Sequence, residues 1–88
     1  MIVVGYANEF IRQYGRLPRA LQQEVKEKIE LFKDRKNHAQ LKVHKLHGKY
    51  KDCLAFSVNY EYRVRFKYIG KAKAVAILIT VGDHDVYK

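Results

Sequence analysis

The sequence has 88 residues, of which 48% are hydrophobic, and this length predicts a single domain over residues 1–88. Its 18 Lys and Arg residues outnumber 9 acidic residues, and the formal net charge of +9 favours polyanionic partners. A single cysteine, Cys53, excludes an internal disulfide, and no apolar run approaches the roughly 20 residues that span a membrane. We therefore expect a cytoplasmic domain that binds nucleic acid, although excess lysine can also serve only solubility.

A short strand and a short helix are predicted first. Residues 2–4 are β-branched and precede Gly5, which is typical of a short strand. Asn8 can then cap a helix that Gly15 can end.

The clearest predicted helix runs from Pro18 to about Lys36. Glu24 and Lys28 lie four residues apart on its polar face, with the acid first, an order that favours an ion pair. Its apolar residues recur at helical spacings: Leu17, Leu21, Val25, Ile29 and Phe32.

From Leu41 onward the apolar period changes toward two, which predicts strands at 43–46, 53–58 and 62–68. The strand at 62–68 alternates apolar residues with Arg63, Arg65 and Lys67, so one of its faces is fully cationic. The near-continuous apolar run 74–81 predicts a central strand that is covered on both faces.

These elements predict an α+β fold of order β-α-α-β-β-β. The sheet is expected to be small and mainly antiparallel, with the two N-terminal helices packed on one face. The other face is then partly open, and we expect Arg63 and Arg65 to lie there.

Three segments together resemble the RelE/ParE toxin superfamily of bacterial and archaeal toxin-antitoxin systems. They are Leu46-His47-Gly48, Tyr62-Arg63-Val64 and Val81-Gly82-Asp83-His84-Asp85-Val86-Tyr87. The segment Leu17-Pro18-Arg19-Ala20-Leu21-Gln22 of the predicted helix also resembles the family, as does the number of residues between Gly48 and Arg63. The resemblance therefore covers nearly the whole chain. The resemblance implies ribosome-dependent mRNA cleavage, in which a ribose 2′-OH attacks the adjacent phosphate without a metal or other cofactor. It also implies a cognate antitoxin protein and contacts with rRNA.

The resemblance assigns roles to five residues. Arg63 stands at the family's catalytic arginine position, where its guanidinium can hold the scissile phosphate in two contacts. His84 stands where many members carry His or Arg and suits proton transfer, and Tyr87 matches a tyrosine that stacks on or orients the nucleotide. Asp85 can orient His84 or act as the base, and Asp52 matches an acidic position in one branch of the family.

Each of these residues also has a purely structural interpretation. Arg63 can be one cation on a solvated strand face, His84 an exposed residue, and Tyr87 a packing residue at the sheet edge. The two carboxylates can simply balance nearby lysines.

The general base is the least determined role. Some members of the superfamily use lysines in the strand that here reads Leu54-Ala55-Phe56, and this chain has none there. The remaining candidates are His84, Asp85, Asp52, His44 and His47.

Further contacts with RNA are expected from basic and histidine residues around the sheet, although plain solubility can explain each exposed lysine. They are Arg65, Lys67, Lys49, Lys51, His47 and His44. His44 with His47, or residues 83–85, could also ligate a cation, but neither set has a recognisable ligand spacing, so we expect no metal.

Two other functions are compatible with the resemblance. One is a ParE-like toxin that poisons DNA gyrase without cleaving RNA, and the other is a decayed homologue that only binds RNA or its partner. ParE-type members generally lack the His/Arg and Tyr pair near the C-terminus, so His84 and Tyr87 favour the nuclease.

Overall fold

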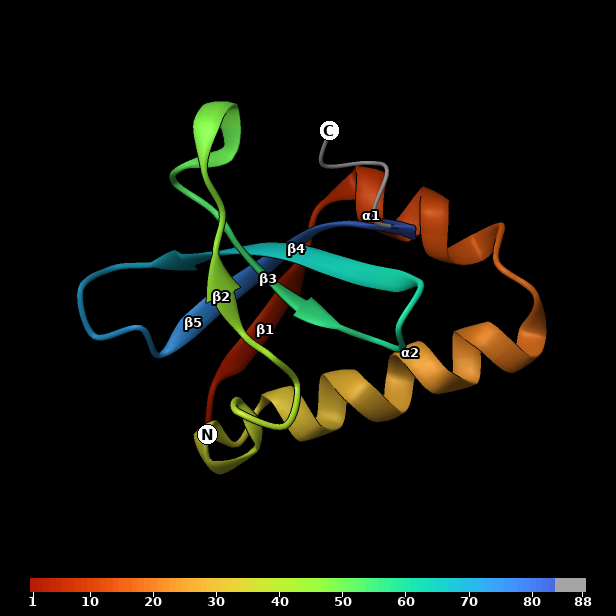
Figure 1. The fold of residues 1–88 in the computed structure, drawn as a ribbon, viewed down its shortest axis with the longest axis horizontal. Coiled ribbons are helices and arrows are strands. Elements are labelled where there is room, and N and C mark those ends of the chain that lie inside the picture. The colour runs from red at the N-terminus through yellow and green to blue at the C-terminus, as the bar shows by residue number, and fades with distance from the viewer. Residues whose placement is uncertain (84–88) are drawn as a thin grey trace.

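The computed structural model describes residues 1–83 and shows two helices beside one five-stranded sheet (Figure 1). The sheet order is β1-β5-β4-β3-β2, with β1 parallel to β5 and the other neighbours antiparallel. The elements are β1 (Val3–Tyr6), α1 (Asn8–Gly15), α2 (Arg19–Phe32), β2 (His44–Lys45), β3 (Leu54–Ser57), β4 (Tyr62–Ile69) and β5 (Val75–Asp83). The predicted α+β fold with a mainly antiparallel sheet is confirmed, but the predicted order β-α-α-β-β-β is one strand short. The sheet has five strands, because the segment expected as a short strand at 43–46 forms the two-residue β2 in addition to β3, β4 and β5. Within residues 1–83, no helix is long and apolar enough to cross a membrane.

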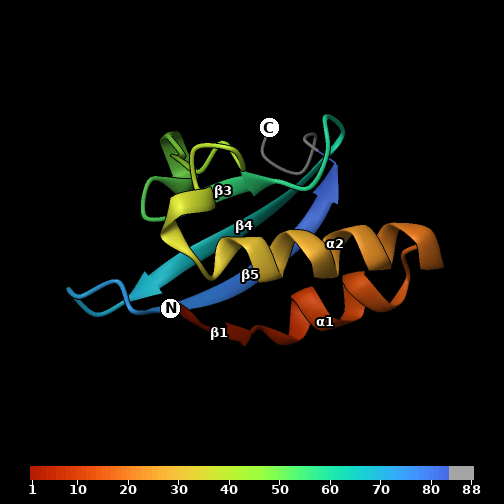
Figure 2. The same ribbon diagram turned by 90° about the horizontal axis from the view of Figure 1, so that it is seen from below.

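The core lies between α2 and one face of the sheet. Phe32 near the end of α2 stacks on Phe56 of β3, with ring centroids 4.7 Å apart, and meets Phe66 of β4 edge-on at 4.7 Å. All three rings are fully buried. Figure 2 shows both helices on the same side of the sheet, so the predicted packing on one face is confirmed.

The opposite side of the sheet, which we call the open face, carries Ser57, Arg63, Arg65 and Lys67. Directly opposite residues in an antiparallel pair share a face, and Ser57 pairs with Arg63. The buried neighbours in β4, Val64 and Phe66, point the other way into the core.

Two predicted helix ends need correction. Helix α2 ends at Phe32 instead of about Lys36, because Asn37 Nδ2 donates to the Leu31 carbonyl oxygen at 2.9 Å and the His38 ring donates to that of Phe32 at 2.8 Å. These side chains satisfy carbonyls at the helix end and so replace a further turn.

Helix α1 begins without a side-chain cap. Asn8 is already its first helical residue, and Ala7 occupies the capping position that was predicted for Asn8. The Ala7 N–H donates to the Leu78 carbonyl oxygen at 2.9 Å. The hydrogen bonding between β1 and β5 therefore continues up to Ala7, the residue just before the helix.

Strand β5 is fully covered on its helix face and only partly covered on the open face, whereas residues 74–81 predicted a strand covered on both faces. Ala76, Leu78 and Val81 are buried on the helix face, and Thr80 is buried on the open face. Ile77 and Ile79 are only half-buried, because the helices cover one face of the sheet. The register between β4 and β5 also shifts by one residue, so the positions that face the helices change from even to odd numbers along β5. An apolar run therefore did not distinguish one covered face from two.

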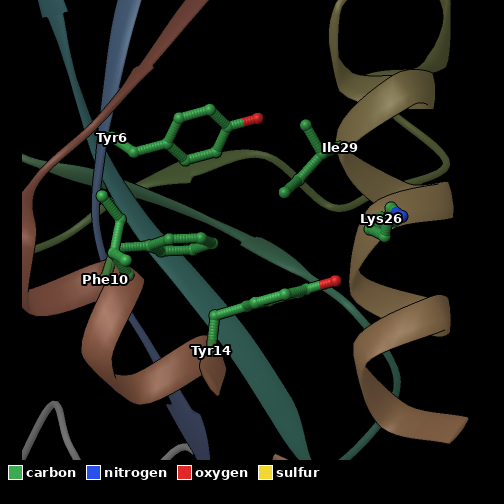
Figure 3. A pocket seen from close by; sticks show the side chains of 6 residues that line it. Tyr6, Phe10, Tyr14, Lys26 and Ile29 are labelled. Atoms are coloured by element: carbon green, nitrogen blue, oxygen red, sulfur yellow. The ribbon is translucent and has the colours of Figure 1, made fainter. Parts of the chain in front are cut away.

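Helices α1 and α2 enclose an aromatic groove of about 330 Å³ on the helix side of the molecule. Figure 3 shows Tyr6, Phe10 and Tyr14 along one wall, facing Ile29 and Lys26 of α2. The rings of Tyr6 and Phe10 lie 5.4 Å apart, and those of Phe10 and Tyr14 lie 6.2 Å apart. This groove lies between the helices and is separate from the open face.

Replacement by alanine is expected to change the free energy of unfolding in opposite directions at two glycines. Gly48 has φ +68°, a left-handed conformation that a Cβ disfavours, so Gly48→Ala should lower the free energy of unfolding by about 1 kcal/mol. Gly15 ends α1 with open space around its Cα, so Gly15→Ala should raise it by about 0.5 kcal/mol. Urea unfolding of both variants measures the difference, and equal shifts would contradict the assigned backbone conformations.

Candidate nucleic-acid interface

A row of side chains crosses the open face from strand to strand. His44 of β2 lies opposite Ala55 of β3, Ala55 lies opposite Arg65 of β4, and Arg65 lies opposite Thr80 of β5. These four residues therefore share one face and follow one another across four strands, about 4.8 Å apart. The row contains no acidic residue.

Arg65 is held in place by two contacts. Its guanidinium carbon lies 4.4 Å from the centroid of the Tyr50 ring, and its Nη1 donates to the Cys53 sulfur at 3.6 Å. Lys49 Nζ also lies 5.2 Å from the same ring. Tyr50 ends a short 3₁₀ turn, Gly48–Tyr50, which places the ring beside the sheet. Such cation–π contacts contribute about 0.5–1 kcal/mol each and fix the cation on the open face.

The side chain of Arg63, two residues earlier in β4, lies at the β3–β4 hairpin and not beside Tyr50. Its Nη1 donates to the Asn59 carbonyl oxygen at 2.7 Å and to the Tyr62 carbonyl oxygen at 3.2 Å. The guanidinium therefore lies against the β3–β4 hairpin, and its Nε and Nη2 donate to no other group within residues 1–83. The two arginines present separate cationic groups, about 7 Å apart along the strand at the backbone.

Thr80 provides a buried hydroxyl in the same row. The residue is 4% exposed, and its Oγ1 has no hydrogen-bond partner within residues 1–83. An unsatisfied buried hydroxyl costs about 1–3 kcal/mol, and such groups often mark a place where a ligand or water binds. Thr80 is thus a polar group poised beside Arg65 without a protein partner in the described part of the chain.

Replacing Thr80 with valine tests this geometry in the free protein. The change keeps the shape and removes the unsatisfied hydroxyl, so Thr80→Val should raise the free energy of unfolding by about 1 kcal/mol. Thr80→Ser keeps the hydroxyl and loses a buried methyl group, so it should lower that free energy. A valine variant less stable than wild type would show that the hydroxyl has a partner after all.

Most of the other predicted contact residues are exposed around this row. His44 Nδ1 donates to the Lys42 carbonyl oxygen at 2.8 Å, which leaves Nε2 as the acceptor of the neutral ring. Lys67 continues the cationic side of β4 beyond Arg65. Residues Lys49, Lys51, His47 and Asp52 lie exposed in the segment between β2 and β3.

Three of the residues expected to act in catalysis, His84, Asp85 and Tyr87, lie outside the described residues. The last described residue, Asp83, pairs with Tyr62, and Gly82 pairs with Arg63. Strand β5 therefore ends beside the start of β4, next to Arg63.

Two groups with shifted pKa values lie away from the row. Burial raises the pKa of the Tyr68 phenol, and the charge of Arg35 partly opposes this shift. The hydrogen bond to Glu30 raises the pKa of Lys33. Within residues 1–83, no group of three or more His, Cys, Asp or Glu side chains is arranged to hold a metal ion.

Tyr50 and Thr80 were not predicted from the sequence as residues of this interface. Tyr50 stands between Lys49 and Lys51, and an aromatic residue among basic ones is a pattern that suits nucleic acid. Thr80 is the one polar residue in the apolar run 74–81. Both signals are present in the sequence, but only the fold brings these residues to Arg65.

The fold is similar to several solved toxin structures. YafQ from E. coli strain BL21(DE3) matches with a TM-score of 0.73 and 15% identity, over 98% of this chain and 97% of that chain. A chain of the archaeal RelE–RelB complex from Pyrococcus horikoshii OT3 matches with a TM-score of 0.72 and 16% identity, over 93% of each chain. A chain of the E. coli RelBE toxin-antitoxin complex matches with a TM-score of 0.70 and 19% identity, over 94% of this chain and 96% of that one.

The sequence itself matches no protein-family model and no curated protein significantly. Similarity at 15–19% identity shows a shared fold. The chemistry of this chain must be argued from its own residues. All three matches cover at least 93% of each chain. The chain therefore has the same fold as these RelE and YafQ structures.

Proposed function

We propose that this protein is the toxin of a type II toxin-antitoxin system and cleaves mRNA on the ribosome. The observation that carries the proposal is the pair Arg63 and Arg65 on the open face of β4, where the row that contains Arg65 has no acidic residue. The formal charge of +9 supports attraction to a ribosome-bound RNA. Neighbours of the same fold are RelE and YafQ toxins.

In the proposed reaction, the ribose 2′-oxygen attacks the adjacent phosphorus as its proton leaves, and the bond to the 5′-oxygen of the next nucleotide breaks. The products are a 2′,3′-cyclic phosphate and a 5′-hydroxyl. The reaction therefore uses no water as the nucleophile and does not require a metal ion. Arg63 binds the scissile phosphate and stabilises the added negative charge of the phosphorane. His84 donates a proton to the leaving 5′-oxygen, and Tyr87 stacks on the nucleotide.

His44 is the best supported of the described candidates for the base. It lies in the same row as Arg65, and its Nδ1 donates to the Lys42 carbonyl oxygen. Its Nε2 has no partner within residues 1–83 and can accept a proton. Asp52 and His47 lie in the segment before β3 and not in the row. Asp85 is the alternative candidate for the general base. If it is not the base, it orients His84.

The proposal includes a cognate antitoxin protein as partner. Two of the similar structures are complexes of a toxin with its antitoxin. An acidic or amphipathic antitoxin segment would neutralise the basic open face and exclude RNA from it. The enzyme would act in the cytoplasm, where ribosomes translate mRNA.

A reconstituted reaction tests the proposal. The purified chain is incubated with an mRNA, either free or on a ribosome with an empty A site, and the RNA ends are mapped. We expect cuts only in the ribosome-bound mRNA, with 2′,3′-cyclic phosphate ends. Intact mRNA in both reactions would refute the nuclease function.

A further inference from the structure

A second cationic site lies next to the open face, on the side of the β3–β4 hairpin that faces α2. It is a pocket of about 270 Å³ between α2, the loop that precedes β2, and the β3–β4 hairpin. Since one water takes about 30 Å³ in the liquid, the pocket has room for a hydrated phosphate group. Its charged and polar lining includes Lys28, Gln40, Lys42, Ser57, Tyr60 and Arg63.

The charge in this pocket is not balanced by the protein. Lys28, Lys42 and Arg63 line it, and no carboxylate does among the described residues. The sequence spacing predicted an ion pair between Glu24 and Lys28, but Glu24 instead accepts a hydrogen bond from Asn59 Nδ2 at 2.9 Å. Lys28 is therefore half-buried without an ion-pair partner within residues 1–83. A partly desolvated cation of this kind favours an anionic ligand.

Arg63 links this pocket to the open face. Its Nη1 is fixed by the Asn59 and Tyr62 carbonyl oxygens, so the guanidinium stays at the hairpin, where it also lines the pocket. A fixed guanidinium loses little further entropy when it binds a phosphate. One arginine thus lies at the boundary between the two sites.

Tyr60 adds an aromatic surface beside these cations. It is 89% exposed at the tip of the hairpin and lines the same pocket. A large exposed ring next to a phosphate-sized cationic pocket is suited to stack on a base, as aromatic residues do in proteins that bind single-stranded nucleic acid.

We infer that this pocket binds a phosphodiester group of the RNA strand next to the scissile one, with the adjoining base on Tyr60. The inference rests on the proposed RNA substrate and extends it. The strand would cross the open face, pass Arg63, and turn around the hairpin toward Lys28 on α2. The site would position the RNA and take no part in bond cleavage.

RNA binding by the free protein tests this inference without any cleavage. The probe is a fluorescein-labelled single-stranded RNA of about ten nucleotides, titrated by fluorescence anisotropy over a range of salt concentrations. Lys28→Gln combined with Lys42→Gln should raise Kd about tenfold and reduce the slope of log K against log salt by about 0.7, the contribution of one single-strand phosphate. Tyr60→Ala should raise Kd about fivefold or more, whereas Tyr60→Phe should bind like wild type.

A matched variant removes the same charge elsewhere. Lys26 lies two residues before Lys28, about 200° around α2, and Lys71 lies in the β4–β5 turn at the other end of β4. Lys26→Gln combined with Lys71→Gln should change Kd less than about twofold and leave the slope unchanged. Equal weakening by both double variants, or no RNA binding by wild type, would overturn the inference.

The outcome is separate from that of the cleavage experiment. If ribosome-bound mRNA stays intact while the lysine and tyrosine effects on RNA binding persist, the nuclease proposal fails and the pocket stands. If mRNA is cleaved and the Lys28 and Lys42 substitutions leave RNA binding unchanged, the pocket fails alone.

Discussion

Replacing Arg63 with alanine is expected to lower the rate of ribosome-dependent mRNA cleavage by about 100- to 1000-fold. The guanidinium would stabilise the negative charge that develops on the phosphorane, and removal of one such preorganised donor typically costs this much. Arg63→Lys should recover only part of the rate, because an ammonium group is a point charge and cannot bind phosphate in two parallel contacts. Single-turnover cleavage on programmed ribosomes measures all three rates.

Lys67→Ala is the control for the loss of a cation. Lys67 lies on the same face of β4 but beyond Arg65, away from the hairpin. Its removal should lower the cleavage rate less than about tenfold, mainly through weaker attraction to RNA. Because Arg63 also bonds the Asn59 and Tyr62 carbonyls, the thermal melting of each variant must accompany the rates. Similar rates for Arg63→Ala and Lys67→Ala at similar stability would contradict the catalytic role.

Replacing Phe32 with alanine is expected to lower the free energy of unfolding by about 3–5 kcal/mol. Phe32 is fully buried, stacks on Phe56, meets Phe66 edge-on and stacks on the His38 ring at 4.9 Å. Small domains have total stabilities of about 5–15 kcal/mol, so this one change removes a large share. Urea unfolding followed by circular dichroism measures the loss.

Ile11→Ala is the matched control, because Ile11 is 55% exposed on α1. It should cost less than about 1 kcal/mol. If Phe32→Ala does not fold, Phe32→Leu, which conserves more volume, should still show a loss of about 1–2 kcal/mol. A Phe32→Leu variant as stable as wild type would show that α2 does not anchor the sheet in the way the ring contacts indicate.

The cationic side of the interface could be predicted from the sequence because it depends on a local period. In β4, residues alternate between the two faces, so Arg63 and Arg65 had to lie opposite Val64 and Phe66. The period of α2 similarly identified its buried face, including Val25, Ile29 and Phe32. Alternation of this kind needs no knowledge of the rest of the chain.

Features that depend on the tertiary path could not be predicted in this way. The contact between Arg65 and Tyr50 requires the 3₁₀ turn after β2 to lie beside β4, which no spacing reveals. The partner of Glu24 is Asn59, 35 residues away, and this contact replaced the ion pair with Lys28 that the helical spacing favoured. Long-range hydrogen bonds of this kind override local preferences of a few tenths of a kcal/mol.

The course of β5 shows the same limit. An apolar run predicts burial but carries no information about how many faces are covered, and the half-buried Ile77 and Ile79 resulted from helices on one side only. The register shift beside Arg65 also has no clear sequence signal. It places Thr80 opposite Arg65 and so brings the buried hydroxyl into the row.

The most direct test of the nuclease function is induction of the wild-type chain in bacterial cells, with the 5′ ends of mRNA mapped by primer extension and gyrase–DNA complexes assayed in the same cultures. The proposed function predicts growth arrest and new 5′ ends inside translated reading frames, which disappear when the start codon of the reporter mRNA is removed. Intact mRNA together with accumulated gyrase–DNA complexes would contradict it and indicate a gyrase poison, and normal growth would indicate a homologue that has lost its activity.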